Sequence, residues 1–373
     1  MAGIYLHIPF CKQRCSYCDF HFSTNFMSYR KELILALCRE IVLRKDEIQT
    51  EVQTIYFGGG TPSLLENQEL NLILQTIRAN YSVSENAEVS LEANPEDVSD
   101  EKLRYWNKAG VNRLSIGLQS FKESDMKWMN RAHLASEGEK SVRLAQSIGF
   151  ENITVDLIYG LPNLSSEEWK NHLQSVVDLG ISHISAYCLT VEPKTALHHQ
   201  VKQRQLITAN EDEQSEQFEL MVAFLKANGF EHYEISNFAK NGAYSKHNSA
   251  YWQGVHYVGI GPSAHSFNGT HRRWNIANNT VYYKNVGENE SWFTRENLTL
   301  NEQWNEIFLT GLRTKWGVSK TALKKIGKLS SSELQKLASM IVEKDLVESE
   351  THYILSEQGK LRADGLASSF FRV

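Results

Sequence analysis

The sequence predicts an α/β fold: a six-unit partial (β/α) barrel, then a mixed α+β extension and a small C-terminal helical domain. Three observations predict it: six short β-branched segments alternate with one-faced helical segments, glycines follow four of those helices, and the alternation stops near residue 229. Such repeats favour parallel strands with right-handed crossovers. Six units are fewer than the eight of a closed barrel, so we expect an open ring. A flat doubly wound sheet is the alternative that periodicity does not exclude.

Each of the six repeats pairs one expected strand with one expected helix. The expected strands are residues 3–9, 54–57, 88–93, 113–118, 154–158 and 183–189. The expected helices are residues 29–44, 69–80, 100–108, 134–148, 165–179 and 212–227. In the first helix Leu33, Leu37 and Ile41 recur every four residues, which indicates one buried face. Ser99 and Ser165, each with acidic residues just after it, are typical helix-capping residues.

We divide the chain into residues 1–228 for the partial barrel, 229–297 for the extension and 298–373 for the C-terminal domain. The extension is expected to hold strands at 231–239, 256–260 and 273–276. The C-terminal domain is expected to hold helices at 301–314, 331–344 and 357–371, with a hairpin arm at 351–356. This pattern resembles that of a winged-helix domain. A net charge of −5 favours a structural or docking module over a nucleic-acid partner.

Three of the five cysteines, Cys11, Cys15 and Cys18, stand within eight residues in HIPFCKQRCSYCDF, directly after the first expected strand. Their C-x3-C-x2-C spacing lets one loop hold three irons of a [4Fe-4S] cluster, which leaves the fourth iron open to a ligand. Zinc is the alternative metal, and His7 or His21 could complete its ligand set. The remaining cysteines are isolated, which argues against a disulfide framework and for a reducing compartment.

The cysteine triplet resembles the signature of the radical S-adenosylmethionine (SAM) superfamily. The resemblance implies a six-unit partial barrel of radical SAM type, a [4Fe-4S] cluster held by the triplet, and SAM chelating the open iron. In that family one electron from the cluster cleaves a carbon–sulfur bond of SAM and releases a 5′-deoxyadenosyl radical. The implied barrel agrees with the six units counted from periodicity.

Polar and glycine residues recur where the expected strands end, which is where a barrel of this kind places its site. They are Gly58-Gly59-Gly60-Thr61-Pro62, Glu92 in LEANP, Gln119 in IGLQS and Asp156 in VDLIYGLP, with Arg131 in MNRAH able to offer a fork to a carboxylate. These elements look like those of the coproporphyrinogen-oxidase-like branch. That resemblance implies SAM contacts at Tyr5, Tyr17, Gly59, Gly60, Thr61, Glu92, Gln119, Arg131 and Asp156, with Tyr187 as a further candidate. No catalytic residue is assigned.

Two features separate members of that branch. Anaerobic coproporphyrinogen III oxidases carry a further cysteine two residues after the triplet, where this chain has Phe20. Residues 247–252 read His247-Asn248-Ser249-Ala250-Tyr251-Trp252 and resemble the HNxxYW motif of the heme chaperones in the branch. Imidazole is a common axial ligand of heme iron, and Tyr251 and Trp252 offer flat apolar faces to a porphyrin. A loop histidine beside packed aromatics is the alternative reading of the motif.

We therefore expect a heme chaperone that delivers heme to client hemoproteins of the respiratory chain, with [4Fe-4S], SAM and heme as cofactors. The alternatives are an oxygen-independent coproporphyrinogen III oxidase, which converts two propionates to vinyls, another radical SAM enzyme, or a purely structural cluster. The resemblance also implies an electron donor and allows a homodimer. Reduced thiols and the absence of a leader favour the cytoplasm, and respiratory clients would place the protein at the inner face of the membrane.

Overall fold

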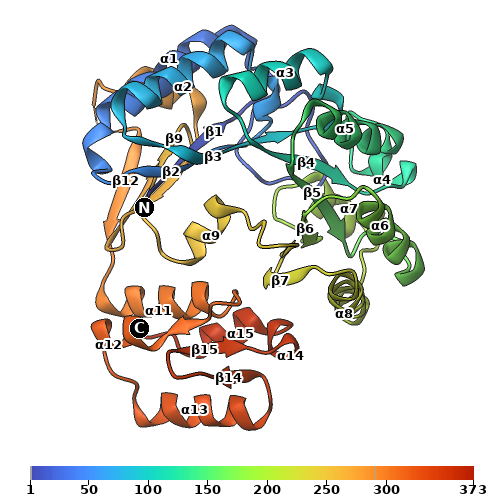
Figure 1. Cartoon of the computed structure of the whole chain (residues 1–373), viewed down its shortest axis with the longest axis vertical. Coiled ribbons are helices and arrows are strands. Elements are labelled where there is room, and N and C mark those ends of the chain that lie inside the picture. The colour runs from blue at the N-terminus through green and yellow to red at the C-terminus, as the bar shows by residue number, and fades with distance from the viewer. Residues whose placement is uncertain (1, 290) are drawn as a thin grey trace.

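The computed structural model describes residues 2–289 and 291–373, and it confirms the predicted partial barrel (Figure 1). Six parallel strands lie side by side in chain order. They are β1 (Ala2–Ile8), β2 (Val52–Gly59), β3 (Val83–Ala93), β4 (Arg113–Gln119), β5 (Asn152–Tyr159) and β6 (His183–Cys188). The covering helices are α1 (Arg30–Leu43), α2 (Asn67–Asn80), α3 (Asp100–Ala109), α5 (Ala135–Ile148), α6 (Ser166–Asp178) and α8 (Glu211–Ala227).

The barrel strands are buried along nearly their whole length, as expected for strands that are covered on both faces. In β1 every residue except Tyr5 is buried, because helices cover one face of the strands and the barrel interior covers the other. Trp106 of α3 and Trp169 of α6 are among the largest fully buried side chains of the main core. The predicted caps are present: the side chains of Ser99 and Ser165 accept hydrogen bonds from backbone N–H groups at the starts of α3 and α6.

The extension adds strands to both edges of the barrel. The full order is β12-β11-β10-β9-β1-β2-β3-β4-β5-β6-β8-β7. The added strands are β7 (Glu231–Glu234), β8 (Asn237–Ala239), β9 (Tyr257–Ile260), β10 (His265–Phe267), β11 (His271–Asn275) and β12 (Phe293–Asn297), and α10 (Asn279–Asn285) precedes β12. The expected single strand 231–239 is wrong: the chain reverses after Glu234, so β7 and β8 pair as an antiparallel hairpin.

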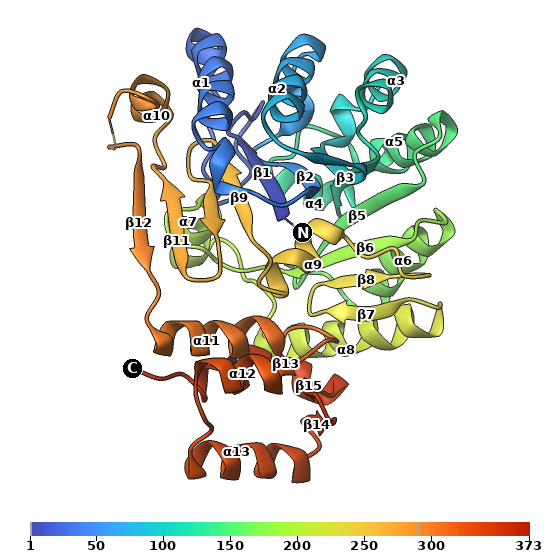
Figure 2. The same cartoon turned by 60° about the vertical axis from the view of Figure 1, so that its left-hand side comes forward.

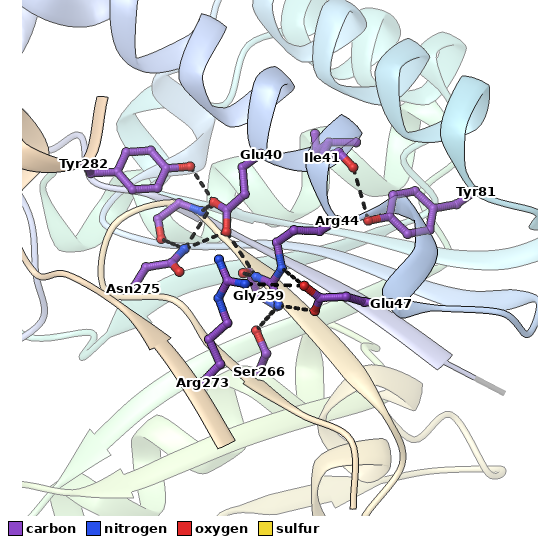
Figure 3. A network of polar contacts seen from close by, with 11 residues as sticks. Glu40, Ile41, Arg44, Glu47, Tyr81, Gly259, Ser266, Arg273, Asn275 and Tyr282 are labelled. Carbon is purple, nitrogen blue, oxygen red and sulfur yellow. Dashed lines mark hydrogen bonds and ion pairs between the residues drawn. The ribbon is translucent and has the colours of Figure 1, made fainter. Parts of the chain in front are cut away.

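A buried polar network joins α1 to the strands beyond β1 (Figure 3). The fully buried Glu40 carboxylate accepts hydrogen bonds from Arg44, Asn275, Tyr282 and the backbone N–H of Gly261. The side chain of Arg44 is also buried. Because each charge is desolvated, removing one partner of such a pair costs about 3–5 kcal/mol. The network therefore fixes the position of the extension against the first repeat of the barrel.

The C-terminal unit lies below the barrel in Figure 1 and has its own hydrophobic cluster, which includes Trp304, Phe308 and Phe370. Its helices are α11 (Leu300–Gly311), α12 (Lys320–Ile326), α13 (Ser331–Val342), α14 (Glu357–Lys360) and α15 (Ala363–Ser368), and its strands are β13 (Val318–Ser319), β14 (Leu346–Glu348) and β15 (His352–Leu355). The expected helix 357–371 is wrong as a single helix, because the structure divides it into α14 and α15. Among the described residues no helix is long and apolar enough to cross a membrane.

Five short helices were not expected from the sequence: α4 (Glu123–Trp128), α7 (Ala196–Lys202), α9 (Lys246–Trp252), α10 and α12. The most important is α9, which holds the HNxxYW motif. Figure 2 shows it inside the ring of strands, near the start of β1. The motif therefore lies on a short helix with a buried His247, and not in a surface loop. Short 3₁₀ turns lie at Met27–Tyr29, Lys45–Glu47, Pro62–Leu64 and Pro95–Asp97.

Candidate cluster and cofactor site

A cavity of about 420 Å³ extends into the partial barrel from the cysteine loop and the strand ends. For convenience it is called the barrel cavity. It brings together residues from the five strands β2 to β6, from the cysteine loop after β1 and from other loops at the same end of the barrel. Its lining includes Cys11, Cys15, Cys18, Tyr17, Gly59, Gly60, Thr61, Glu92, Gln119, Arg131, Asp156 and Tyr187. All three predicted cluster ligands and all but one of the predicted SAM contacts therefore face one space.

Tyr5 is the predicted SAM contact that does not line the barrel cavity. Its ring stacks against Tyr56 with centroids 6.1 Å apart, and its hydroxyl lies 3.3 Å from Nδ1 of His7. Tyr56 does line the cavity, so Tyr5 lies one side chain behind the wall. In this arrangement Tyr5 supports the wall of the site.

The cysteine loop is held by backbone bonds to distant segments. The N–H of Cys11 donates to the carbonyl of Ser23 at 3.1 Å, and the N–H of Ser16 donates to Met129 at 2.9 Å. No disulfide involves the three cysteines. Burial raises the pKa of the Cys11 thiol to about 11 and that of Cys18 to about 12, so binding a metal there would release protons.

The donor set fits an iron–sulfur cluster better than zinc. Three thiols on one loop face a common cavity, and thiolates are the ligands of such clusters. Neither of the two histidines considered for zinc lines the barrel cavity. Nε2 of His7 lies 2.7 Å from the carbonyl oxygen of His21, and Nε2 of His21 lies 2.7 Å from Oδ1 of Asn279. Among residues 2–289 and 291–373, no three His, Cys, Asp or Glu side chains form a single-ion site.

The glycine turn after β2 leaves room for the backbone of the cysteine loop. A Cβ atom on Gly60 would lie 2.7 Å from the carbonyl oxygen of Phe10 and 2.8 Å from that of Ile8. Gly59 has φ +107°, a conformation that favours glycine. These two residues let the end of β2 approach the loop without a side chain between them, which keeps backbone groups accessible from the cavity.

Two partly buried carboxylates stand on neighbouring parts of the wall. Glu92 accepts hydrogen bonds from the Tyr56 hydroxyl at 2.9 Å and from the N–H of Gly59 at 3.2 Å. Asp156 accepts from the Ser115 hydroxyl at 3.0 Å. Burial raises the pKa of Glu92 to about 7 and that of Asp156 to about 6, because desolvation disfavours their charged forms. Both can accept hydrogen bonds from hydroxyl or ammonium groups of a ligand.

Arg131 supplies the positive side of the cavity. Its Nη2 donates to Oδ1 of Asn94 at 2.8 Å and to the carbonyl of Gly117 at 3.0 Å, while Nη1 lies 3.6 Å from Sγ of Cys15. Its Nε is buried without a hydrogen-bond partner among the described residues. A buried donor without a partner is costly, so a ligand carboxylate would satisfy it. Sequence analysis missed Asn94, although it follows Glu92 by two residues.

His247 does not face the barrel cavity. It is buried, its Nδ1 lies 2.7 Å from Oγ1 of Thr54, and its Nε2 lies 2.8 Å from the hydroxyl of Tyr251. The Glu88 carboxylate accepts hydrogen bonds from the N–H groups of Lys246 and His247, which anchors the start of α9. Both imidazole nitrogens are therefore engaged. In this conformation His247 attaches α9 to β2 and offers no free nitrogen to a metal.

The structure separates the three predicted heme residues. Tyr251 and Trp252 line a second cavity on the other side of α9, and His247 lines neither cavity. Asn248 faces the barrel cavity together with Ser245. Sequence analysis missed Asn248 as a lining residue, although it stands within the motif. The HNxxYW motif thus forms part of the wall between two cavities.

Comparisons with known proteins show the family to which the chain belongs. Residues 5–176 match the family model of the radical SAM superfamily. The heme chaperone HemW of Bacillus subtilis is 34% identical over 375 residues, covering 99% of each chain. HemW of Escherichia coli is 36% identical over 268 residues, covering 70% of this chain and 69% of the relative. The structure of E. coli coproporphyrinogen III oxidase, HemN, aligns with a TM-score of 0.85 at 23% identity, covering 99% and 90%.

A six-unit partial barrel with a cysteine triplet at the mouth of its cavity, together with the matching model, defines a radical SAM protein. Within that class, similarity along the full chain is to heme chaperones. The chain belongs to the HemW family of heme chaperones.

Proposed function

We propose that this protein binds heme and delivers it to hemoproteins of the respiratory chain, and that it holds a [4Fe-4S] cluster and SAM in the barrel cavity. The full-length similarity to HemW carries the proposal, since 99% of this chain aligns with 99% of the B. subtilis chaperone. An electron donor for the cluster and the client hemoproteins are the partners that this function requires. Homodimerisation and peripheral association with a membrane belong to the same proposal.

Each group in the barrel cavity has a role in this proposal. Cys11, Cys15 and Cys18 hold the cluster, and the backbone at Gly59 and Gly60 receives the amino group of SAM. When bound together, the cluster and SAM supply one-electron cleavage of a carbon–sulfur bond.

The remaining predicted contacts surround the rest of the SAM molecule. Glu92 accepts hydrogen bonds from the ribose hydroxyls, and Arg131 offers its unpartnered Nε to the carboxylate. Tyr17, Thr61, Gln119 and Asp156 complete the wall, with Tyr187 beside them. We retain Tyr5 as a residue that positions Tyr56 behind that wall.

Ligation of heme iron by His247 would require a change from the conformation described above. Two hydrogen bonds of that imidazole would have to break, and the ring would have to leave a buried position. Tyr251 and Trp252 are accessible from the second cavity and remain candidate porphyrin contacts.

Coproporphyrinogen oxidation is the second candidate function, because the chain shares the fold of the oxidase HemN. At 23% identity that similarity supports the fold and not the reaction. Phe20 occupies the position where the oxidases carry a further cysteine, and its side chain is exposed on the rim of the barrel cavity. This departure favours the chaperone.

One paired assay separates the two functions. Heme is titrated into anaerobically reconstituted protein, and the same sample is incubated with coproporphyrinogen III, SAM and a reductant. We expect a Soret band typical of ligated heme and no protoporphyrinogen. Formation of protoporphyrinogen would establish the oxidase, and failure to bind heme would remove the chaperone function.

A further inference from the structure

The second cavity, about 740 Å³ in volume, lies between α9 and the C-terminal unit. For convenience it is called the aromatic cavity. Its wall combines residues of α9, β9 and β10 with residues of α11, α12 and β15. The aromatic side chains on it are Tyr251, Trp252, Tyr257, Phe267 and Trp316. Cavities of roughly 300–1,000 Å³ with aromatic walls and few polar groups are typical binding sites for cofactor-sized molecules.

One imidazole stands among the described residues of this wall. His352, at the start of β15, is partly exposed and lines the cavity. Its Nδ1 lies 2.9 Å from Oγ1 of Thr351. Among the described residues no hydrogen-bond partner is found for its Nε2. An imidazole held through one nitrogen presents the other to a metal in a fixed orientation. His247, in contrast, has both nitrogens engaged.

The wall also holds one partly accessible cation. Arg272 of β11 pairs with Glu306 of α11 at 2.5 Å, and their side chains are 33% and 24% exposed. Both residues line the cavity. A carboxylate group on a ligand could approach the same guanidinium, because five N–H donors exceed what one partner uses. The aromatic cavity thus offers flat faces, one imidazole and one guanidinium.

We propose that the aromatic cavity binds heme, with Nε2 of His352 as an axial ligand of the iron, Trp252 and Trp316 against the porphyrin, and Arg272 as the partner of a propionate. This inference rests on the proposed function, which supplies the ligand class, and adds the place of binding and the ligating side chain. Heme would then contact both the HNxxYW motif and the C-terminal unit. Release to a client would require a ligand of the client to replace His352 on the iron and the two walls of the cavity to separate.

Two variants test the site, each with a matched control. His352→Ala removes the ligand, and His271→Ala is its control because Thr270 contacts the Nδ1 of His271 in the same way and His271 does not line the cavity. Ala322→Trp on α12 fills the cavity, and Lys324→Trp places the same side chain at an exposed position of that helix. Circular dichroism and reconstituted iron content verify that each variant folds and retains its cluster.

Ferric heme is titrated into wild type and all four variants. Loss of an outer partner of a metal ligand already weakens metal binding about 10–100-fold, so His352→Ala should raise the heme Kd at least about tenfold and shift the Soret band. Ala322→Trp should raise the Kd similarly, and the two controls should stay within about twofold of wild type.

The outcomes distinguish this inference from the function on which it rests. If wild type binds heme and both His352→Ala and Ala322→Trp bind equally well, the site is elsewhere and the chaperone function stands. If Ala322→Trp alone weakens binding, His352 is overturned as the ligand. If wild type binds no heme, the proposed function itself is wrong.

Discussion

The two cavities on either side of α9 differ in how the chain builds them. The barrel cavity is lined by polar side chains at consecutive strand ends, including the partly buried carboxylates Glu92 and Asp156. The aromatic cavity is lined by rings from the extension and from the C-terminal unit, segments that are far apart in the sequence. Repeated β–α units place polar side chains at predictable strand ends. The interface between the extension and the C-terminal unit depends on tertiary packing, which no local sequence pattern indicates.

Cys15→Ala gives the largest expected difference between the cavities. Loss of one of three cluster ligands should reduce reconstituted iron and sulfide to background and abolish SAM binding, while heme binding in the aromatic cavity should remain within about twofold of wild type. Metal analysis and heme titration on one sample measure both. Cys38→Ala, on α1 away from the loop, is the control. Retention of the full cluster would show that Cys15 is not a ligand.

Gly60→Ala tests the close approach that forms the mouth of the barrel cavity. A Cβ there would meet two backbone oxygens, so we expect a loss of about 1–3 kcal/mol in the free energy of unfolding, measured by urea denaturation. Gly365→Ala in α15 is the control, because no atom lies within 4 Å of the added Cβ. It should stabilise the chain by up to about 1 kcal/mol. Equal effects at both positions would contradict the assigned role of Gly60.

Glu92→Gln tests whether desolvation in the barrel cavity raises the pKa of Glu92. Burial raises the pKa of Glu92 from 4.5 to about 7, so the folded chain holds a proton that the unfolded chain releases. Without a ligand, wild type should lose stability as pH rises from about 4.5 to 7. One pKa unit corresponds to about 1.4 kcal/mol, and we expect the glutamine variant to avoid a loss of about 1–2 kcal/mol between pH 5 and 8. An identical pH slope in thermal unfolding of both proteins would refute this account.

Glu357→Gln gives the smallest expected effect and concerns a contact between the extension and the C-terminal unit. Glu357 of α14 lies 3.1 Å from Nδ1 of His232 in β7, and this hydrogen bond lowers its pKa from 4.5 to about 2. The stabilisation is present above pH 4.5 and is lost as pH falls toward 2. Because the side chain is 44% exposed, we expect less than about 1 kcal/mol at pH 7.

Chemical denaturation at pH 7 and pH 3 measures the Glu357→Gln difference. Glu350→Gln, at an exposed position, provides the control. A difference between Glu357→Gln and wild type that is as large at pH 3 as at pH 7 would contradict the titration argument.

The barrel could be predicted from the sequence because the patterns that indicate it lie within single helices, strands and loops. The period of Leu33, Leu37 and Ile41 marks a helix by itself, and the cysteine triplet lies in one loop. The grouping of polar residues at strand ends follows from parallel topology, and the structure shows that grouping.

The long-range parts could not be predicted in the same way. Strands β9 and β8 join opposite edges of the barrel sheet, a pairing that depends on tertiary packing. Helix α9 has only seven residues, too few for a periodic signal, and its burial depends on Thr54 and Glu88, more than 150 positions earlier in the chain. The separation of His247 from Trp252 follows from that burial.

Helix α9 is a thin partition with a different ligand environment on each side. Asn248 faces one space and Trp252 the other, and four residues of helix advance only about 6 Å along its axis. If a ligand in one cavity displaces α9, the wall of the other cavity therefore moves as well. A substitution within the HNxxYW motif is therefore expected to alter both the barrel cavity and the aromatic cavity. Loss of heme binding in such a variant would not by itself identify the iron ligand.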